Sequence, residues 1–277
     1  MKLSVFFLDI LHVMEQEKIS LREAVLKVRE LGFSGVDIEG CELDAYPDAV
    51  NIIHDAGMAF SNVYGIYDLV NGKYDDATEL IDHAVNCGAK VAMLIPGSFV
   101  AGEIPDPARK SEDVMSDFLS SNKKSLRALS AIRKTAKYAQ ERGVTLTVES
   151  FGDINSLTAY TAEIKWLLDN ISELKFTFDI GNFYLNGEDV CHAYSKLSDK
   201  TVHVHCKDYL TVPPVGHKDF SYQRIAASIG GGAAPTEKIV RELLACGYDG
   251  YFTVEYLYAE NDLKALRESA EYLNSIG

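Results

Sequence analysis

The sequence predicts an α/β fold, a single (β/α)8 TIM barrel over residues 1–277. Eight expected strands alternate along the chain with expected helices, and the last four of these strands show the period-two pattern of apolar and polar residues. Glycine stands just past five of these helical stretches, at positions 32, 57, 88, 143 and 247, where a helix needs a left-handed residue to end. A chain of 277 residues is an ordinary length for one such barrel. No GxGxxG follows the first strand, which argues against a dinucleotide-binding sheet.

The first half of the chain supplies four strand–helix units. The first strand is expected over residues 2–9, and the helix after it begins at Ser20, whose side chain can form a capping box with Glu23. The remaining strands of this half are expected over 35–39, 58–66 and 89–95, and the helices over 45–56, 74–87 and 122–142, the last preceded by a polar stretch at 102–117.

The second half begins with the stretch Val144–Glu149, in which Val and Leu alternate with Thr and end in a glutamate. This alternation predicts a buried strand that delivers a carboxylate at its C-terminal end. The later strands are expected over 175–179, 201–205 and 250–255, and the helices over 158–170, 189–197, 236–245 and 261–276.

Four of the expected strand ends carry ionisable side chains on the same parity: Glu149, Asp179, His205 and Glu255. In a TIM barrel the C-terminal strand ends form the active-site face, and these four strands are consecutive neighbours. Three converging carboxylates would repel one another unless a cation neutralised them. The sequence therefore predicts a site for one divalent ion, with Mn²⁺, Mg²⁺, Co²⁺ and Zn²⁺ all compatible with oxygen ligands plus one imidazole.

These residues, with the motifs Asp179-Ile-Gly-Asn182 and His205-Cys-Lys-Asp208, resemble the xylose isomerase-like TIM barrels, the superfamily of sugar phosphate isomerases and epimerases and of AP endonuclease 2-like proteins. The resemblance implies that Glu149, Asp179, His205 and Glu255 bind the metal. It also implies that Glu149 and Glu255 form the acid/base pair of an epimerase.

The chain departs from parts of that pattern. Asn182 stands where many relatives have a histidine, Asn155 where tagatose-type epimerases have a substrate-binding glutamate, and Thr211 where they have an arginine. Endonuclease IV carries additional zinc-binding histidines, and the third and fourth strand ends here offer tyrosine and isoleucine instead. A trinuclear nuclease site is therefore not expected.

The expected chemistry is proton abstraction beside a carbonyl. A metal that polarises a substrate carbonyl stabilises an ene-diolate, which leads to isomerisation or epimerisation of a ketose or related keto-sugar. Expulsion of a β-hydroxyl from the same intermediate would give a dehydratase of a keto-polyol, of the inosose or dehydroshikimate type. An endonuclease IV-like relative and a non-catalytic sugar-binding barrel are the further alternatives.

Four residues are candidates for substrate binding: Lys207, Asn182, Glu39 and His203. Three of them have a purely structural alternative. Lys207 could pair with Asp208 at the rim, His203 could be a satisfied core histidine, and Glu39 could be a solvated strand-end charge.

Composition restricts partners and compartment. The net charge of −14 opposes binding to nucleic acid or to an anionic membrane, and no apolar run approaches the length of a membrane span. Five scattered cysteines without a CxxC pair favour the cytoplasm. The expected partner is a small sugar or polyol. A homo-oligomer is compatible with the sequence.

The expected loop over residues 209–235 is a candidate lid. It contains Ile229-Gly-Gly-Gly232, for which two interpretations are open: a flexible turn, or backbone amides presented to a phosphate.

Overall fold

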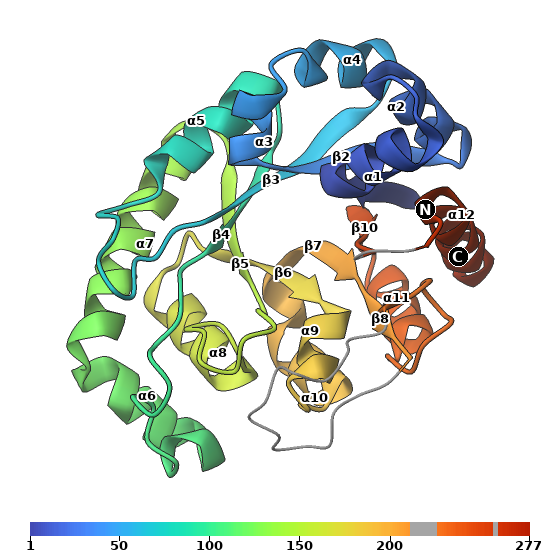
Figure 1. Ribbon diagram of the computed structural model, residues 1–277. Helices are drawn as coiled ribbons and strands as arrows, with labels where there is room; N and C mark the ends of the chain where they lie inside the picture. The colour runs from blue at the N-terminus through green and yellow to red at the C-terminus, as the bar shows by residue number, and fades with distance from the viewer. Residues whose placement is uncertain (211–225, 257–259) are drawn as a thin grey trace.

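A computed structural model describes residues 1–210, 226–256 and 260–277. Within these ranges eight parallel strands close into a barrel in the order β1-β10-β7-β6-β5-β4-β3-β2, with helices around it (Figure 1). The predicted (β/α)8 TIM barrel is confirmed. The barrel strands are β1 Lys2–Phe6, β2 Phe33–Glu39, β3 Ala59–Ile66, β4 Val91–Ile95, β5 Thr145–Glu149, β6 Lys175–Asp179, β7 Thr201–Cys206 and β10 Tyr251–Val254.

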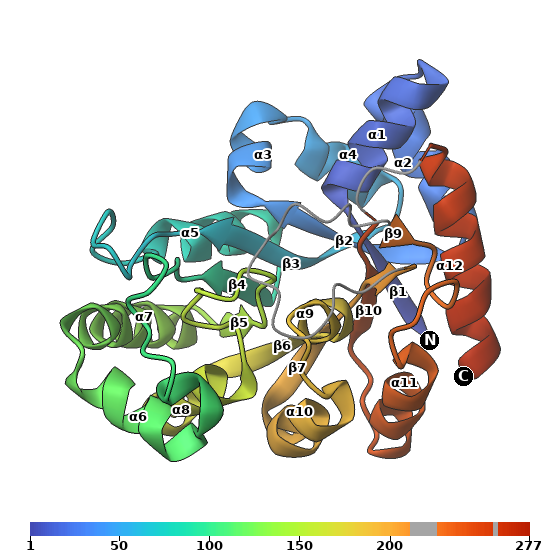
Figure 2. The same ribbon diagram turned by 60° about the horizontal axis from the view of Figure 1, so that its bottom comes forward.

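The helices form the outer layer of the molecule (Figure 2). They are α1 Phe7–Glu17, α2 Leu21–Glu30, α3 Gly40–Ala45, α4 Ala49–Asp55, α5 Thr78–Cys87, α6 Glu112–Ser121, α7 Lys123–Glu141, α8 Thr161–Asn170, α9 Ile180–Leu185, α10 Val190–Leu197, α11 Thr236–Ala245 and α12 Asp262–Ile276. The expected capping box of Ser20 and Glu23 is present at the start of α2. None of the helices in the described ranges combines the length and apolar character that crossing a bilayer requires.

Some helices were not expected from the sequence: α1, α3, α6 and α9. The strand predicted over residues 2–9 was too long, because β1 ends at Phe6 and α1 begins at Phe7. An uninterrupted apolar run does not distinguish the two states, but the buried residues of α1 include Phe7, Ile10 and Leu11, the spacing of one helical face. Within the polar stretch at 102–117, Ser111 caps α6 through a hydrogen bond from the Val114 amide.

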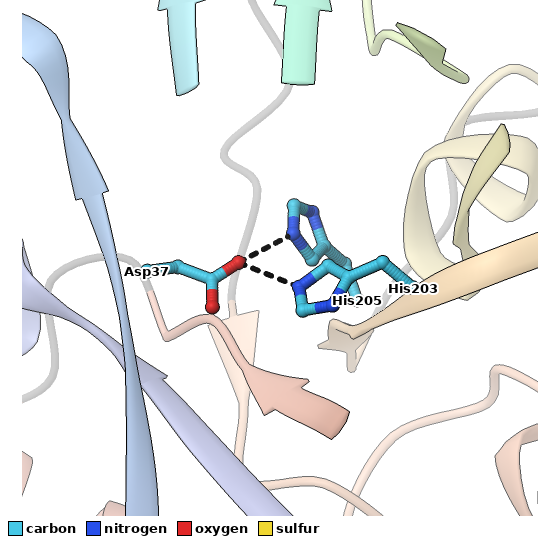
Figure 3. Close-up of side chains that lie close together, drawn as sticks. All are labelled: Asp37, His203 and His205. Carbon is cyan, nitrogen blue, oxygen red and sulfur yellow. Dashed lines mark hydrogen bonds and ion pairs between the residues drawn. The ribbon is translucent and has the colours of Figure 1, made fainter. Parts of the chain in front are cut away.

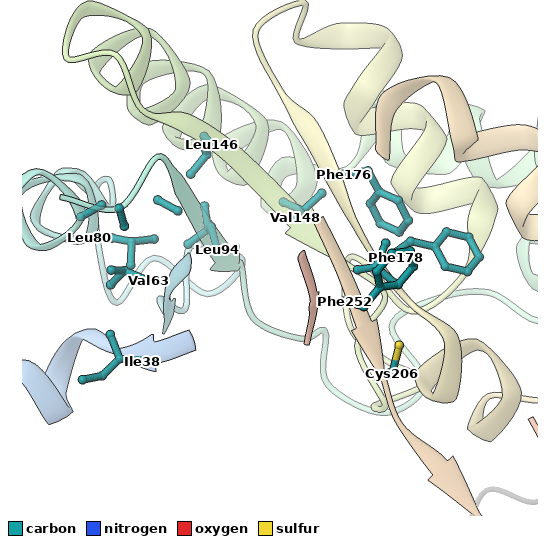
Figure 4. Packing of buried hydrophobic residues seen from close by; sticks show 14 of the residues in the cluster. Ile38, Val63, Leu80, Leu94, Leu146, Val148, Phe176, Phe178, Cys206 and Phe252 are labelled. Carbon is teal, nitrogen blue, oxygen red and sulfur yellow. The ribbon is translucent and has the colours of Figure 1, made fainter. Parts of the chain in front are cut away.

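Apolar side chains of the barrel strands point outward and form the hydrophobic core with the helices. Ile38, Val63 and Leu94 gather beside Leu80 of α5, and Val148 lies near Phe176 and Phe178 (Figure 4). The opposite faces of these strands bury polar side chains, among them Ser4, Asp37, Asn62, Thr147, Thr177, His203 and Thr253. The barrel interior is therefore polar, and it forms the floor beneath the C-terminal strand ends.

A small hairpin follows β7, made of β8 (Asp208–Tyr209) paired antiparallel with β9 (Ala226–Ala227). Residues 211–225 of the expected lid lie outside the described residues. The glycine segment after β9 is anchored: the amides of Gly230 and Gly232 each donate to Asp208 Oδ2 at 3.0 Å. These amides serve a carboxylate of the protein itself, so the segment is neither a free turn nor an open phosphate cradle.

One buried carboxyl group outside the set at the strand ends lies in the first turn of α8. Glu163 is fully buried, and neither of its carboxyl oxygens has a hydrogen-bond partner among the described residues. Burial raises the pKa of Glu163 to about 8, with the nearby Glu188 adding to the shift. The folded chain therefore keeps a proton on Glu163 at pH values where the unfolded chain releases it.

Replacement of Glu163 by glutamine is expected to remove a pH-dependent loss of stability. A carboxyl whose pKa is raised in the folded state destabilises the protein as pH rises from the unfolded to the folded pKa, by up to about 1.4 kcal/mol per pH unit. The Tm of Glu163→Gln relative to the wild type should therefore rise between about pH 5.5 and pH 8. The matched control is Glu141→Gln at the exposed end of α7, which should show no such change. Equal pH dependence in Glu163→Gln and the wild type would contradict the expectation.

Candidate active site

Strands β5, β6, β7 and β10 are neighbours in the barrel, so their C-terminal ends lie side by side. Asp179 of β6 pairs in register with His205 of β7, and Glu149 is the last residue of β5. All three side chains are buried, with Glu149 4% exposed and the other two 0%. The predicted convergence of these strand ends is therefore present.

Glu149, Asp179 and His205 form a group that can hold a metal ion. One potential ligand atom from each lies within 4.8 Å of the other two. His205 Nδ1 is 2.9 Å from Glu149 Oε2 and 4.0 Å from Asp179 Oδ2. Two carboxylate oxygens and one imidazole nitrogen fit the divalent ions Mn²⁺, Mg²⁺, Co²⁺ and Zn²⁺.

Glu255 lies just past β10 and pairs with Lys207 instead of joining this group. Its Oε1 is 2.7 Å from Lys207 Nζ, which is also 3.3 Å from Asp179 Oδ2. Burial raises the pKa of Glu255, and Lys207 partly opposes the shift. Burial would lower the pKa of Lys207, but Asp179 and Glu255 outweigh it and hold that pKa well above its usual range. Lys207 is thus an ammonium between two carboxylates of the site.

Lys207 pairs with Asp179 and Glu255, and Asp208 has other partners. Asp208 is 1% exposed, and its carboxylate accepts the backbone amides of Tyr209, Gly230, Gly232 and Ala234. The two consecutive residues after β7 therefore have different partners. Lys207 faces the strand ends, whereas Asp208 fixes the loop.

Asn182 orients the carboxylate of Asp179. Its backbone amide donates to Asp179 Oδ1 at 2.7 Å, which caps α9, and its side-chain Nδ2 donates to Asp179 Oδ2 at 3.0 Å. Lys207 Nζ donates to Asn182 Oδ1 at 3.4 Å, and Asn182 Nδ2 also donates to the Ser150 carbonyl at 2.8 Å. The Asn182 amide is therefore committed to protein groups in this structure, and a direct role in substrate binding stays a prediction.

Gly181 allows the backbone of β7 to approach α9. A Cβ atom at this position would lie 2.6 Å from the carbonyl oxygen of Lys207 and 2.6 Å from its Cβ. Real Cβ atoms do not approach backbone this closely, so a larger residue would displace the segment that carries Lys207. The close approach of Lys207 therefore explains why the Asp179-Ile-Gly-Asn182 motif has glycine at position 181.

His203 lies one layer deeper and contacts Asp37 of β2, a residue that the sequence analysis did not single out. His203 Nε2 is 2.7 Å and His205 Nε2 is 3.1 Å from the same oxygen, Asp37 Oδ2 (Figure 3). Asp37 could have been found, because it shares the inward parity of Glu39 on a strand whose Val36 and Ile38 point outward. Substrate binding by His203 stays a prediction.

The contacts of His205 and Asp37 shift both of their pKa values. Burial would lower the pKa of His205, but hydrogen bonds with Asp37 and Glu149 outweigh it and raise that pKa to about 10. Burial would raise the pKa of Asp37, but His203 and His205 hold it far below its ordinary range. In the metal-free protein, His205 is therefore an imidazolium between two carboxylates.

Two further positions from the sequence analysis make contacts outside the group of Glu149, Asp179 and His205. Glu39 ends β2 and takes part in a capping box with Glu42 at the start of α3, so its role in substrate binding stays a prediction. Asn155 accepts from Arg109 Nη2 at 3.0 Å, and its carbonyl accepts the Phe99 amide at 2.8 Å. Asn155 therefore ties the loop after β4 to the loop after β5.

Comparison with known proteins identifies similar chains across nearly the whole length. The model of a family described as xylose isomerase-like TIM barrel matches residues 25–276. An inosose dehydratase of Geobacillus thermodenitrificans is 24% identical over 268 residues, which are 88% of this chain and 84% of that protein.

Solved structures share the fold. A probable 3-DHS dehydratase from Bacillus anthracis superposes with a TM-score of 0.73 at 15% identity, covering 99% of each chain. A 3-keto-D-glucoside 4-epimerase from E. coli gives a TM-score of 0.66 at 17% identity, covering 92% of this chain and 94% of that chain. At these identities the likeness extends to the fold alone.

Gly181→Ala is expected to destabilise the protein, because its Cβ would collide with the backbone of Lys207. Overpacking of this kind costs roughly 1–3 kcal/mol, which thermal denaturation would measure as a lower Tm. Gly231→Ala is the matched control, since its nearest neighbour would lie at 3.1 Å and the next at 3.9 Å. A similar small change in both variants would show that the close approach is not tight.

Lys207→Met is expected to destabilise the metal-free protein, because it leaves Asp179 and Glu255 without their shared cation. Removing one partner of a buried ion pair costs about 3–5 kcal/mol. Added Mn²⁺ should raise the Tm of this variant more than that of the wild type, since the ion supplies the missing positive charge. Lys165→Met, which breaks an exposed pair with Asp169, should cost less than about 0.5 kcal/mol. Unchanged stability of Lys207→Met would show that the pairs with Asp179 and Glu255 contribute little.

Proposed function

The chain belongs to the xylose isomerase-like TIM barrel family, and from this premise we propose that it is a divalent-metal-dependent isomerase or epimerase that acts on a ketose or related keto-sugar through an ene-diolate. The observation that supports the proposal most strongly is the buried group of Glu149, Asp179 and His205 at adjacent strand ends. Its two carboxylates and one imidazole suit an ion that binds neighbouring oxygens of a polyol.

Glu149, Asp179 and His205 would hold the ion, and Glu255 would join them once Lys207 releases it. A bound divalent ion would polarise the substrate carbonyl and acidify the proton on the neighbouring carbon. Asn182 keeps the Asp179 carboxylate turned toward the site through the bonds to both of its oxygens. Asp179 is thereby held in place by α9, the helix that follows β6.

Glu149 and Glu255 are the proposed acid/base pair. In the barrel order, β6 and β7 separate their strands, so the two carboxyl groups approach the site from different sides. Proton removal by one and return by the other would invert the carbon, which is epimerisation, whereas removal and return by one group would give aldose–ketose isomerisation. The raised pKa of Glu255 suits a group that must both accept and donate a proton.

Dehydration of a keto-polyol is the second candidate, and Lys207 favours it. Its ammonium, 2.7 Å from Glu255 Oε1, could protonate a leaving hydroxyl after the proton beside the carbonyl has been removed. A curated relative named inosose dehydratase and a fold relative described as a probable 3-DHS dehydratase add to this candidate. The net charge of −14 argues against an endonuclease, because nucleic acid is also negatively charged. A non-catalytic sugar-binding barrel would not need the acid/base pair.

Proton exchange in D₂O tests the proposal directly. Protein loaded with Mg²⁺ and incubated with a panel of ketoses and keto-polyols is expected to introduce deuterium beside the carbonyl, which proton NMR detects. The product would distinguish isomerase, epimerase and dehydratase. Glu149→Gln and Glu255→Gln should each slow exchange by about 10²–10⁴-fold, because each removes a proton-transfer group.

The control for this assay is Glu141→Gln, whose exposed side chain lies on α7, and its exchange rate should equal that of the wild type. Absence of exchange across the panel, repeated with Mn²⁺, Co²⁺ and Zn²⁺, would count against ene-diolate chemistry and favour the non-catalytic barrel.

A further inference from the structure

We propose that Asp37 is a positioning residue for the candidate metal centre, because its carboxylate fixes the Nε2–H tautomer of His205 and so leaves Nδ1 as the ligand nitrogen. Figure 3 shows Asp37 reaching from β2 across the barrel to both histidines of β7. The inference rests on the proposed metal-dependent function, in which His205 is a ligand.

The two nitrogens of His205 each face a carboxylate. Nδ1 is 2.9 Å from Glu149 Oε2, and Nε2 is 3.1 Å from Asp37 Oδ2. A metal-bound imidazole carries one N–H, and its other nitrogen presents a lone pair to the metal. A lone pair directed at a carboxylate oxygen is repulsive unless a cation lies between the two. The tautomer of a metal-bound His205 therefore depends on which of the two carboxylates can bind the same cation as the imidazole.

Asp37 cannot share one, because hydrogen-bond donors already fill it. Oδ1 accepts from the hydroxyls of Ser4, Ser61 and Thr253 at 2.9, 2.6 and 3.1 Å, respectively. Oδ2 accepts from Asn62 Nδ2 at 3.1 Å and lies 2.7 and 3.1 Å from the Nε2 atoms of His203 and His205. A carboxylate offers about four lone-pair sites, so the four neutral donors alone are enough to occupy them and leave none for a metal. Although Asp37, His203 and His205 are close enough to hold an ion, they form a hydrogen-bonded cluster instead.

Glu149 has the opposite surroundings. It lies with Asp179 around His205 Nδ1, where a second carboxylate oxygen is within ligand distance of a common ion. A cation placed there would replace the Nδ1 proton, whereas the Nε2 proton would remain bonded to Asp37. A carboxylate that accepts the remote N–H of a metal-bound histidine orients the ring and strengthens the metal–nitrogen bond.

Aromatic packing fixes the plane of the His205 ring. The Phe6 ring lies against it with centroids 5.0 Å apart and planes at 72°, and the His203 ring lies at 5.2 Å and 85°. These rings leave a fully buried imidazole little freedom to exchange its nitrogens by flipping. The orientation that Asp37 selects is therefore maintained by packing.

Nitrogen NMR of the wild-type protein tests the tautomer. Protein labelled with ¹⁵N-histidine, with the His205 signals assigned by their absence in His205→Gln, is titrated with Zn²⁺ as a diamagnetic probe. We expect Nε2 to keep its proton throughout and the Nδ1 resonance to change when Zn²⁺ is added. A Zn²⁺-bound His205 that is protonated at Nδ1 would overturn the proposal without the use of any Asp37 variant.

Asp37→Asn tests the positioning role. The amide retains the size of the carboxylate but loses its charge, so Mn²⁺ affinity, measured by electron paramagnetic resonance, should fall by about 10–100-fold. In the NMR spectrum, the hydrogen bond to the Asp37 carboxylate should move the His205 Nε2 proton downfield in the wild type, and this shift should be lost in Asp37→Asn. Ser61→Ala is the matched control, because it removes one neutral donor to Asp37 and leaves the bond to His205 intact, and it should change Mn²⁺ affinity by less than about threefold.

A folded Asp37→Asn protein with wild-type Mn²⁺ affinity would overturn the positioning role, and if that variant does not fold, the wild-type tautomer decides. Failure of the proposed function gives a different result. Wild-type protein that binds neither Mn²⁺ nor Zn²⁺ would remove the metal centre altogether, while the Nε2 proton signal of the metal-free protein would show separately whether the Nε2–H of His205 is bonded to Asp37.

Discussion

The buried carboxylate of Asp37 is the interaction on which the polar interior of the barrel depends. Its partners come from β1, β3, β7 and β10, so one side chain of β2 connects strands on several sides of the ring. An uncompensated charge at this depth would be strongly destabilising, and the two histidines and the neutral donors make it tolerable. The deep layer of the barrel is thus built around a charge, and the strand-end residues stand directly above it.

At the strand ends above Asp37, buried negative charge is compensated by a different set of groups. Glu149, Asp179 and Glu255 bring three carboxyl groups to one end of the barrel, and in the metal-free protein the positive charges beside them belong to His205 and Lys207. Compensation by Lys207 requires a close approach of β7 to α9, which Gly181 permits. Because both cations are protein groups, part of the carboxylate charge is compensated before a metal binds.

The sequence was sufficient to predict the barrel and the convergence of Glu149, Asp179 and His205, because period-two alternation and the position of a strand end are local properties. It was not sufficient for the short helices. The helices α3 and α9 are six residues each and begin at the residue directly after a strand, and six residues are too few for a helical period to be recognised. Asp37 was not predicted, because only the residues at the strand ends were considered, and Asp37 lies two residues before Glu39 at the end of β2. The pairing of Glu255 with Lys207 was not predicted, because the sequence places Asp208 directly beside Lys207 as an alternative partner.

The anchoring of the loop after β7 has a consequence for how this protein can change. Asp208 binds the amides of Gly230, Gly232 and Ala234, and β8 pairs with β9, so both ends of the segment between them are secured independently of what the segment contains. Doubling the length of a loop closed in this way costs only about 0.6 kcal/mol of chain entropy. Insertions or deletions between Leu210 and Ala226 are therefore expected to leave the barrel strands in place, because the anchors on both sides of the segment do not depend on its length.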